Sequence, residues 1–315
     1  MERKNEKEYR LFTEVQRNYT NKMTRTASPL RYPGGKSSLH KLVSGIIYAN
    51  DLEGGHYAEP FAGGGGLALS LLFEGVVREI YLNDIDPAIA AFWRSILGHS
   101  DEFCELIEST PVTIEEWHKQ KSAYAELQNG SNDIALGFST LFLNRTNRSG
   151  IIKGAGVIGG LQQTGNYPLD CRFNKEDLIK RVKRIDKYKN RIHFTQLDAL
   201  DFLPIMEKNL PTRSLICADP PYYGKGAHLY TSFYTPEDHS TLAKAMLKIK
   251  KSWITTYDNC AEISKIYKGR RQFEFSIQYS AQTKRLGSEL LIVSNDIDLP
   301  SNLPVMPLHE IIHLT

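Results

Sequence analysis

The sequence has few features of a secreted, membrane-embedded or disulfide-stabilised protein. It contains only four cysteines, at positions 104, 171, 217 and 260, and no C-x-x-C pair. This wide spacing argues against a disulfide scaffold or a zinc ribbon and is typical of a reducing cytosol. No apolar run reaches the roughly 18 residues of a membrane-spanning helix, and the charged start MERKNEKEYR does not resemble a signal peptide. We therefore expect a soluble cytoplasmic protein.

The sequence also has little net charge. A formal charge of +3 is too small to identify a nucleic-acid-binding protein, so the distribution of basic residues has to decide. The hydrophobic content of 41% is sufficient for a full core. A length of 315 residues accommodates one large domain, or a main domain with an insertion.

Strand and helix patterns alternate after a polar N-terminal extension, residues 1–27. HYAEPF (56–61) predicts a strand, the following glycines a tight turn, and LALSLLF (67–73) a helix. EIYLND (79–84) predicts the next strand, and Pro87 suits the first turn of another helix. This β-α-β-α order is typical of an α/β fold with a doubly wound, Rossmann-like parallel sheet.

The alternation stops between about residues 100 and 185. The pattern there is mostly helical, with a glycine-rich stretch at 149–165. Strand patterns resume at RIHFTQLD, SLICAD, SWITTYD, FEFSIQY and ELLIVSN. The sequence therefore predicts a main domain in two parts, 28–100 and 186–315, with an inserted, mostly helical domain at 101–185.

Four consecutive glycines, Gly63 to Gly66, lie between the first strand and its helix. Glycine allows the backbone to approach a ligand closely, and an acid about 20 residues further on can bind ribose hydroxyls. Asp84 is at that distance. Gly63, Gly65 and Ala68 also satisfy G-x-G-x-x-A, so the motif predicts an adenosine-containing ligand and leaves a nicotinamide-dependent oxidoreductase open. A turn that serves only packing is the structural alternative.

Two further patterns match known motifs only in part. RYPGGKSSL (31–39) imitates the end of a phosphate-binding loop, but Leu30 stands where the first glycine is required. HEIIH (309–313) matches the H-E-x-x-H zinc pattern, but the preceding LPVMPL is not typical of a helix. We therefore expect neither a phosphate-binding loop nor a metal site.

SLICADPPYYGKG (214–226) places an acid, two prolines and two tyrosines after a predicted buried strand. The exocyclic amine of a nucleobase is a poor nucleophile because its lone pair is delocalised into the ring. Acceptors for both amine protons orient the nitrogen and favour a more tetrahedral geometry. Asp219 offers a carboxylate acceptor and Pro220 a carbonyl, and the backbone of Pro220 and Pro221 is fixed. Tyr222 offers a face for stacking a base that has left the duplex.

This stretch therefore predicts a site that activates the amine of a nucleobase. A Pro-Pro turn after a buried strand is the structural alternative.

Together these motifs resemble the Dam-type (D12 class) family of DNA adenine-N6 methyltransferases. The resemblance rests on Phe61 with the glycine run, on Asp84 and on DPPY. YPGGK, FLNRTNRSG, RFN, WITTYDN and ELLIVSN are similar to that family as well. The similarity covers about residues 28–295 in the family's order, with the cofactor turn first, the target-recognition insert next and the catalytic motif last.

The resemblance implies that S-adenosyl-L-methionine is the cofactor and that N6 of adenine in double-stranded DNA is the methyl acceptor. It also implies that the target adenine is flipped out of the duplex before the reaction. The implied catalytic residues are Asp219, Pro220, Pro221 and Tyr222. The implied cofactor pocket comprises Tyr32, Lys36, Glu59, Phe61, Gly63, Gly65, Asp84, Asp198 and Asp219. We expect direct methyl transfer without a covalent enzyme intermediate.

The insert contains the residues expected to bind DNA. Arg145, Arg148 and Lys153 surround its glycine-rich loop. Phosphate contacts supply affinity, and arginines that reach guanine edges supply sequence choice. The basic run at 180–189 is explained equally well as a solvated helix face. The loop is longer than that of the GATC-reading members, so we assign no recognition sequence.

Other functions remain open at this stage. Methylation of cytosine N4 uses the same amine chemistry, although serine more often stands at the position of Asp219 in such enzymes. A DNA-binding protein with a decayed methyltransferase core is a third class. We expect a monomeric, cytoplasmic protein of bacterial or phage origin, and any cognate restriction endonuclease would act as a separate protein.

Overall fold

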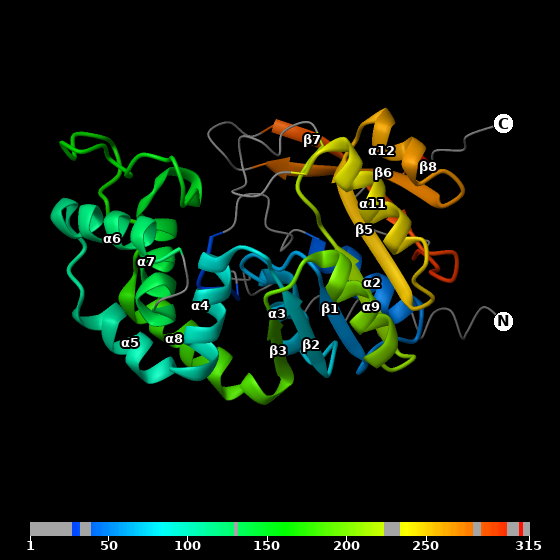
Figure 1. Ribbon diagram of the computed structural model, residues 1–315, viewed down its shortest axis with the longest axis horizontal. Helices are drawn as coiled ribbons and strands as arrows, with labels where there is room; N and C mark the ends of the chain where they lie inside the picture. Colours follow the sequence, from blue (N-terminus) through cyan, green and yellow to red (C-terminus); the bar gives the residue numbers. More distant parts are fainter. Residues whose placement is uncertain are drawn as a thin grey trace, which may run out of the picture.

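The computed structural model describes residues 27–31, 39–128, 132–223, 234–279, 285–300 and 309–310. Almost all of the predicted N-terminal extension lies outside these ranges. Within them, one eight-stranded sheet has the order β3-β2-β1-β4-β5-β7-β6-β8 (Figure 1). Its strands are β1 (His56–Glu59), β2 (Glu79–Asn83), β3 (Ile192–Thr195), β4 (Ser214–Ala218), β5 (Ser252–Asp258), β6 (Arg271–Tyr279), β7 (Arg285–Val293) and β8 (His309–Glu310).

The sheet is mixed, so the expected doubly wound parallel sheet is confirmed only for part of it. Strands β1 to β5 are parallel, as the β-α-β order predicts. β7 pairs antiparallel with both β5 and β6, and β6 also pairs antiparallel with β8. β6 ends at Tyr279 and β7 begins at Arg285, and this link is too short for the crossover that a parallel pair needs.

Both faces of the parallel strands are buried, which explains their continuous apolar runs. In β4, Leu215 and Cys217 pack into the hydrophobic cluster on one face, while Ile216 and Ala218 pack into the cluster on the other. One cluster includes α2 (His40–Ala49), α3 (Gly66–Phe73) and α4 (Pro87–Gly98). The other includes α9 (Ala199–Asn209), α11 (Pro236–Met246) and α12 (Ala261–Ile266).

The chain changes direction across the sheet between β1 and β4. β1 pairs with β2 on one side and with β4 on the other, so successive strands are added outwards from this pair. In open α/β sheets, ligands bind beyond the carboxyl ends of the strands at such a switch point. The fold therefore predicts a ligand site at the segments that follow β1, β2 and β4.

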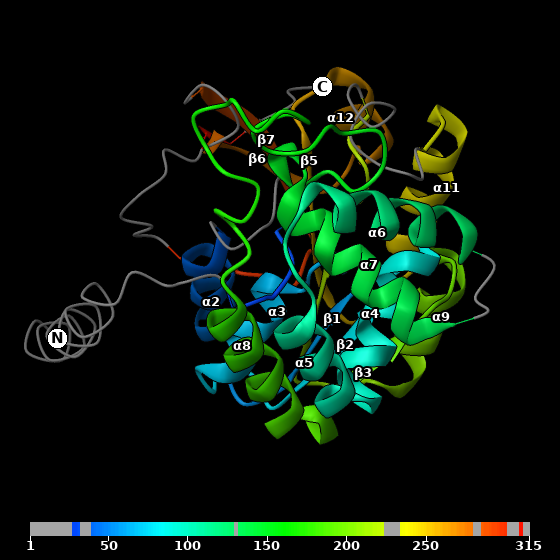
Figure 2. The ribbon, with the colours of Figure 1, turned by 90° about the vertical axis from the view of Figure 1, so that its left-hand side faces the viewer.

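A group of helices separates β2 and β3 in the sequence. These are α5 (Ser100–Ser109), α6 (Ile114–Glu126), α7 (Asp133–Thr146) and α8 (Lys175–Lys187), followed by a short 3-10 turn. Figure 2 shows them side by side with α4. Gly137 allows α7 to approach α4 closely, because a Cβ there would lie 2.8 Å from the carbonyl oxygen of Ala91.

The helix caps are those that the local sequence favours. Asn174 accepts a hydrogen bond from the amide of Asp177 at the start of α8 (2.8 Å). Thr235 and Asp238 form a capping box at the start of α11, with Pro236 at its first position. No helix in the described ranges is long and apolar enough to cross a membrane.

Candidate active site

The glycine turn after β1 is held by the strand that follows it. The amide of Gly63 donates to Oδ2 of Asp84 (2.8 Å), and the carbonyl of Gly63 accepts from Nε1 of Trp93 (2.9 Å). Gly65 has a φ of +58°, and a Cβ there would lie 2.7 Å from the Trp93 ring. The glycine at position 65 is therefore required both by the backbone conformation and by the close approach of Trp93.

Asp84 lies at the end of β2, where the sequence placed the ribose-binding acid. Burial raises the pKa of its carboxyl to about 7, despite hydrogen bonds from the amides of Asp86 and Gly63. The half-buried carboxylate at this position is ready to accept hydrogen bonds from hydroxyl groups. An ionised Asp84 is stabilised by such donors, because they replace the water that burial has removed.

Glu59 ends β1, and it is buried more completely than Asp84. Its exposed fraction is 8%, and Oε1 accepts a hydrogen bond from the hydroxyl of Tyr57 (3.0 Å). Burial is the main cause that raises its pKa to about 8, and the negative charge of Asp219 raises it further. Glu59 therefore lies close enough to the DPPY segment for the two carboxyl groups to interact.

The DPPY segment follows β4 and is held in place by the two neighbouring strands. Oδ1 of Asp219 accepts from the hydroxyl of Thr256 in β5 (2.9 Å). The hydroxyl of Tyr222 donates to Oε1 of Glu289 in β7 (2.6 Å). The amide of Tyr223 donates to Oδ1 of Asp258 in β5 (2.8 Å).

Asp258 and Glu289 are register partners of β5 and β7, so the two acids lie opposite each other. WITTYDN and ELLIVSN are recognisable as segments in the sequence, but the roles of Thr256, Asp258 and Glu289 within them are not. Their role depends on the order of the strands in the sheet. The ring of Tyr222 is 6% exposed, so its predicted stacking face lies within the protein in this structure.

Tyr234 is a further residue that sequence reasoning missed. Its ring meets Phe61 edge-on, with centroids 5.8 Å apart, and lies 5.4 Å from the ring of His239. Burial raises the pKa of Tyr234, and the charges of Asp198, Asp238 and Asp84 raise it further. The ring therefore stands between the glycine-turn segment and the acids after β2 and β3.

Asp198 itself caps α9, where Oδ1 accepts from the amide of Leu200 (2.8 Å). The chain before it is tied to β2, because the side chain of Asn83 donates to the carbonyl of Leu197 (2.9 Å). Asp198 is thus placed beside the end of β2, near Tyr234. Tyr32 and Lys36, the other predicted cofactor residues, lie outside the described ranges.

The expectation that Arg145 contacts DNA is corrected by the structure. Arg145 is 7% exposed, and its guanidinium donates to the carbonyl of Pro29 through Nε (2.6 Å) and Nη2. Burial lowers its pKa to about 9, with Arg181 and Arg31 adding to the effect, so the group remains positive at neutral pH. Arg145 lies on the inner side of α7 and does not reach the surface. It therefore holds a buried backbone segment in place through the carbonyl of Pro29.

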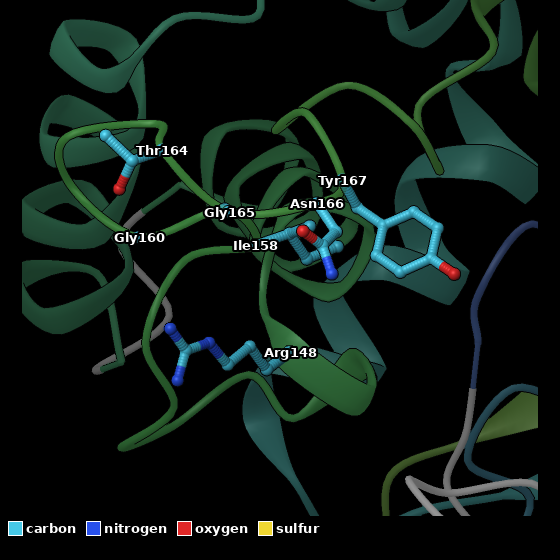
Figure 3. Close-up of a pocket in the computed structure, with 8 residues that line it drawn as sticks. Arg148, Ile158, Gly160, Thr164, Gly165, Asn166 and Tyr167 are labelled. Atoms are coloured by element: carbon cyan, nitrogen blue, oxygen red, sulfur yellow. The ribbon is translucent and has the colours of Figure 1, made fainter.

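Arg148 and Lys153 are exposed, as a DNA contact requires. Arg148 borders a surface hollow of about 450 Å³, shown in Figure 3. Asn166 and Tyr167 border the same hollow from the far end of the glycine-rich loop, and Tyr167 is 65% exposed. This hollow belongs to the insert and not to the carboxyl ends of the strands.

The glycine-rich loop has a defined structure without regular elements. The amide of Arg148 donates to the carbonyl of Gly156 (3.0 Å), and Asn147 and Val157 form an antiparallel bridge. The side chain of Gln163 donates to the carbonyls of Ile158 and Gly160 and accepts from the amide of Leu169. These hydrogen bonds fix the position of Arg148 relative to the opposite rim of the hollow.

Several basic residues of the run on α8 already contact other groups of the protein. Lys180 pairs with Glu176 (2.6 Å) and Arg181 with Asp177 (2.7 Å). The guanidinium of Arg184 lies over the ring of Phe73 in α3, 4.2 Å from its centroid. These contacts favour a solvated, internally paired helix face for this part of the run.

The model of the D12 class N6 adenine-specific DNA methyltransferase family matches residues 32–285. The chain therefore belongs to this family. It is an adenine-specific DNA methyltransferase by family, S-adenosyl-L-methionine is the cofactor, and DNA is the substrate. The nicotinamide alternative that the glycine turn left open is overturned by this match.

The chain is also similar to individual proteins. It is 20% identical over 238 residues to the Type II methyltransferase M.MjaIII of Methanocaldococcus jannaschii, covering 70% of this chain and 80% of that protein. A SAM-dependent methyltransferase structure from Agrobacterium tumefaciens aligns with a TM-score of 0.36 at 11% identity, over 82% of this chain and 61% of that one. A putative RNA methyltransferase from Pyrococcus horikoshii aligns with a TM-score of 0.37 at 10% identity, over 84% and 85%.

The described residues fit this cofactor. The turn has no room for a side chain at Gly65, and the amide of Gly63 donates to the half-buried acid Asp84. Glu59 and Asp84 are acidic groups that follow adjacent strands, and their carboxyls fit a cofactor that carries both hydroxyl donors and positive charge. The cofactor supplies an electrophilic methyl group, and the protein has to bring a nucleophile to it.

Proposed function

We propose that this enzyme methylates N6 of adenine at a specific site in double-stranded DNA, after the target base has been flipped out of the helix. The observation that carries the proposal is the position of Asp219 and Pro220. Both residues follow β4. Asp219 is close enough to Glu59 to raise the pKa of Glu59, and the hydroxyl of Thr256 holds the carboxylate of Asp219. A base delivered there meets two acceptors beside the cofactor turn.

The chemistry asked of the chain is orientation and charge stabilisation. Asp219 accepts one proton of the adenine amine and the carbonyl of Pro220 accepts the other, so the lone pair of N6 is directed away from the ring. S-adenosyl-L-methionine, when bound, would supply the methyl group that N6 takes up, and S-adenosylhomocysteine would be the leaving group. N6 passes its surplus proton to Asp219, which releases it to solvent. Preorganised acceptors of this kind cost no reorganisation at the moment of reaction.

No covalent enzyme intermediate is required. Cys217, two residues before Asp219, is buried in β4 and packs into the hydrophobic cluster on one face of the sheet. A thiol held in that direction is unsuited to attack a base beyond the end of the strand.

The cofactor-binding residues divide into two groups by position. Gly63, Gly65 and Asp84 form the turn and its acid, where a ribose would be bound. Glu59 and Asp219 lie towards the charged methionine end. Phe61, Asp198 and Tyr234 complete the wall, and Tyr32 and Lys36 are proposed as further members on the resemblance alone.

The insert is proposed as the part that recognises the DNA sequence, and the domain division at 101–185 is kept as part of this proposal. Arg148 and Lys153 are exposed on a loop whose shape is fixed by hydrogen bonds. We assign the reading of a guanine edge to Arg148, whose guanidinium offers paired donors, and a phosphate contact to Lys153. The similarity to a Type II methyltransferase supports a restriction endonuclease as a separate partner.

Methyl transfer from tritiated S-adenosylmethionine to plasmid DNA tests the proposal, with nucleoside mass spectrometry of the product. We expect label in N6-methyladenine, and none with the Asp219→Ala variant. Label in N4-methylcytosine, or in RNA alone, would show that the target base or the substrate has been assigned wrongly. Methylation-sensitive single-molecule sequencing of host DNA then gives the recognition sequence.

A further inference from the structure

A short segment, Ser28–Arg31, lies between the insert and the cofactor turn. It has no regular secondary structure, so its backbone polar groups need partners from elsewhere in the protein. Ser28, Pro29 and Leu30 are buried. The segment is therefore an internal connector and not a surface strand.

Its backbone is held by side chains of the insert. Nδ2 of Asn144 donates to the carbonyl of Arg31 and Oδ1 accepts from the Arg31 amide, both at 2.7 Å. Arg145 donates to the carbonyl of Pro29, and Arg181 donates to that of Ser28 (2.8 Å).

The opposite side of the segment touches the cofactor turn. A Cβ at Gly64 would lie 3.1 Å from Oγ of Ser28 and 3.3 Å from Cβ of Leu30. A side chain at Gly64 would therefore force Ser28 or Leu30 to move by a few tenths of an ångström, because the segment is packed close to it. A shift of Ser28 or Leu30 towards the turn would displace the backbone of Gly64, which lies between the two glycines of the proposed ribose site.

Asn144 also holds the DNA-facing loop. The same Nδ2 atom that donates to Arg31 donates to the carbonyl of Gly150 (2.8 Å). Gly150 follows Arg148 by two residues, has a φ of +77°, and is so close to Arg31 that a Cβ would lie 2.6 Å from its carbonyl oxygen. Asn144 is fully buried, so no water competes for these hydrogen bonds.

We infer that Asn144 is a positioning residue that couples DNA binding by the insert to cofactor binding at the glycine turn. The inference rests on the proposed function, because it takes the loop at Arg148 as the DNA-facing part. The chain of contacts runs from Gly150 through Asn144 to Arg31, and along Ser28–Arg31 to Gly64. A ligand on either side fixes the position of this one segment, so the second ligand binds to a segment already in place.

Thermodynamic linkage makes this coupling reciprocal, since the factor by which DNA tightens cofactor binding equals the factor by which the cofactor tightens DNA binding. The quantity to measure is the ratio of two dissociation constants for S-adenosylhomocysteine. One is measured on the full-length protein alone, and the other on the protein saturated with a duplex that carries the methylated site. We expect DNA to tighten S-adenosylhomocysteine binding about fivefold or more in the wild-type protein.

Asn144→Ala should bring this ratio close to one. Asn147→Ala is the matched control, because Asn147 is 1% exposed and sits at the end of the same helix. Its hydrogen bonds involve Trp117, Ile151 and Ile152 and so hold the loop without reaching the segment. Asn147→Ala should weaken DNA binding but keep the wild-type ratio of dissociation constants at saturating DNA. If the ratio depended only on packing at this end of the helix, Asn147→Ala would lower it as well.

Folding of each variant is checked by circular dichroism and cooperative thermal unfolding. If Asn144→Ala does not fold, Arg181→Met decides the question, because it removes the hydrogen bond to Ser28 from a partly exposed position. Lys180→Met, on the solvated side of the same helix, is its control. A reduced ratio in Arg181→Met and an unchanged one in Lys180→Met support the coupling.

The inference is overturned if the wild-type ratio is one, or if the ratio survives the deciding variant. These outcomes differ from a failure of the proposed function, in which S-adenosylhomocysteine or DNA does not bind at all, or N6-methyladenine is not formed. Isothermal titration calorimetry gives both dissociation constants without turnover, so the two ideas are judged separately.

Discussion

The hydroxyl of Tyr222 donates a 2.6 Å hydrogen bond to the buried carboxylate of Glu289, 67 residues further along the chain. Asp258, opposite Glu289 in the sheet, accepts from the amide of Tyr223. The two acids of neighbouring antiparallel strands thus fix two successive residues of the catalytic segment. The hydroxyl of Tyr222 has a structural role that is separate from any stacking by its ring.

This relationship separates two roles of Tyr222 experimentally. Tyr222→Phe should lower the free energy of unfolding by about 1–3 kcal/mol, because a buried hydrogen bond to Glu289 is lost. Its kcat should fall less than about tenfold, whereas Tyr222→Ala should lose about 100-fold or more, because the ring is gone. Glu289→Gln is the matched control, since its amide oxygen still accepts from the hydroxyl. Equal kcat values for the phenylalanine and alanine variants would exclude stacking as the task of the ring.

Asp219 should be essential for methyl transfer, because it is placed both beside the cofactor and at the amine of the target base. Asp219→Ala removes one of the two amine acceptors, and we expect kcat to fall by about 100-fold or more. Thr256→Val keeps the carboxylate but removes the hydroxyl that holds it, so a smaller loss in kcat is expected. Single-turnover kinetics with a fixed duplex measures both. If Thr256→Val costs as much as Asp219→Ala, the hydroxyl itself takes part in the reaction.

Cofactor binding should release protons near neutral pH. The pKa values of Asp84 and Glu59 are raised to about 7 and about 8, so both carboxyls are partly protonated at pH 7 without ligand. Positive charge and hydroxyl donors on the cofactor favour the ionised forms and lower both values. Affinity should therefore rise as pH increases from 6 to 8, because fewer protons have to be removed.

Calorimetry in two buffers of different ionisation enthalpy counts these protons. Glu59→Gln should remove its share of the release, while Asp84 continues to contribute. The same shifts oppose folding at high pH, because the unfolded chain ionises these groups more readily and binds fewer protons above their ordinary pKa values. Glu59→Gln should thus gain stability relative to wild type as pH rises from 5 to 8. If neither the wild-type protein nor Glu59→Gln released protons on cofactor binding, Asp84 and Glu59 would not be the groups that ionise when the cofactor binds.

Arg148 and Lys153 should differ in what they contribute to DNA binding. Arg148→Ala should cost about 1–3 kcal/mol on the cognate duplex and relax sequence choice, because a guanine edge is no longer read. Lys153→Ala should weaken binding to cognate and scrambled duplexes alike and flatten the salt dependence. Fluorescence anisotropy at several salt concentrations distinguishes the two. Equal losses on both duplexes would make Arg148 a phosphate contact and move the specificity determinant to the rim at Asn166 and Tyr167.

Substitution of Arg145 should act mainly on folding and not on DNA recognition. Arg145→Ala leaves the buried carbonyl of Pro29 without its donor, and we expect a loss of about 2–4 kcal/mol in the free energy of unfolding. The salt dependence of DNA binding should keep its wild-type slope, since no phosphate contact is removed. Denaturant titration and anisotropy measure the two effects. A flattened slope in a stable variant would restore Arg145 as a DNA contact.

Local chemistry allowed much of this protein to be predicted from its sequence. The order strand, glycine turn, helix and strand follows from short-range patterns, and so do the caps at Asn174 and Thr235. The family motifs are contiguous, so Gly63, Asp84 and the DPPY segment were found where they stand. Their chemistry depends on residue type and spacing, which the sequence displays directly.

Other features were decided only when distant segments met. Tyr222 meets Glu289 across 67 residues, and Asn144 meets Arg31 across 113, through the order of the strands and the packing of α7. A basic residue near a glycine-rich loop looks exposed in sequence, yet Arg145 is turned inwards because it lies on the side of a buried helix that faces Pro29. Hydrogen-bond partners, burial and the antiparallel edge of the sheet depend on where elements lie in space, and local propensity does not encode that.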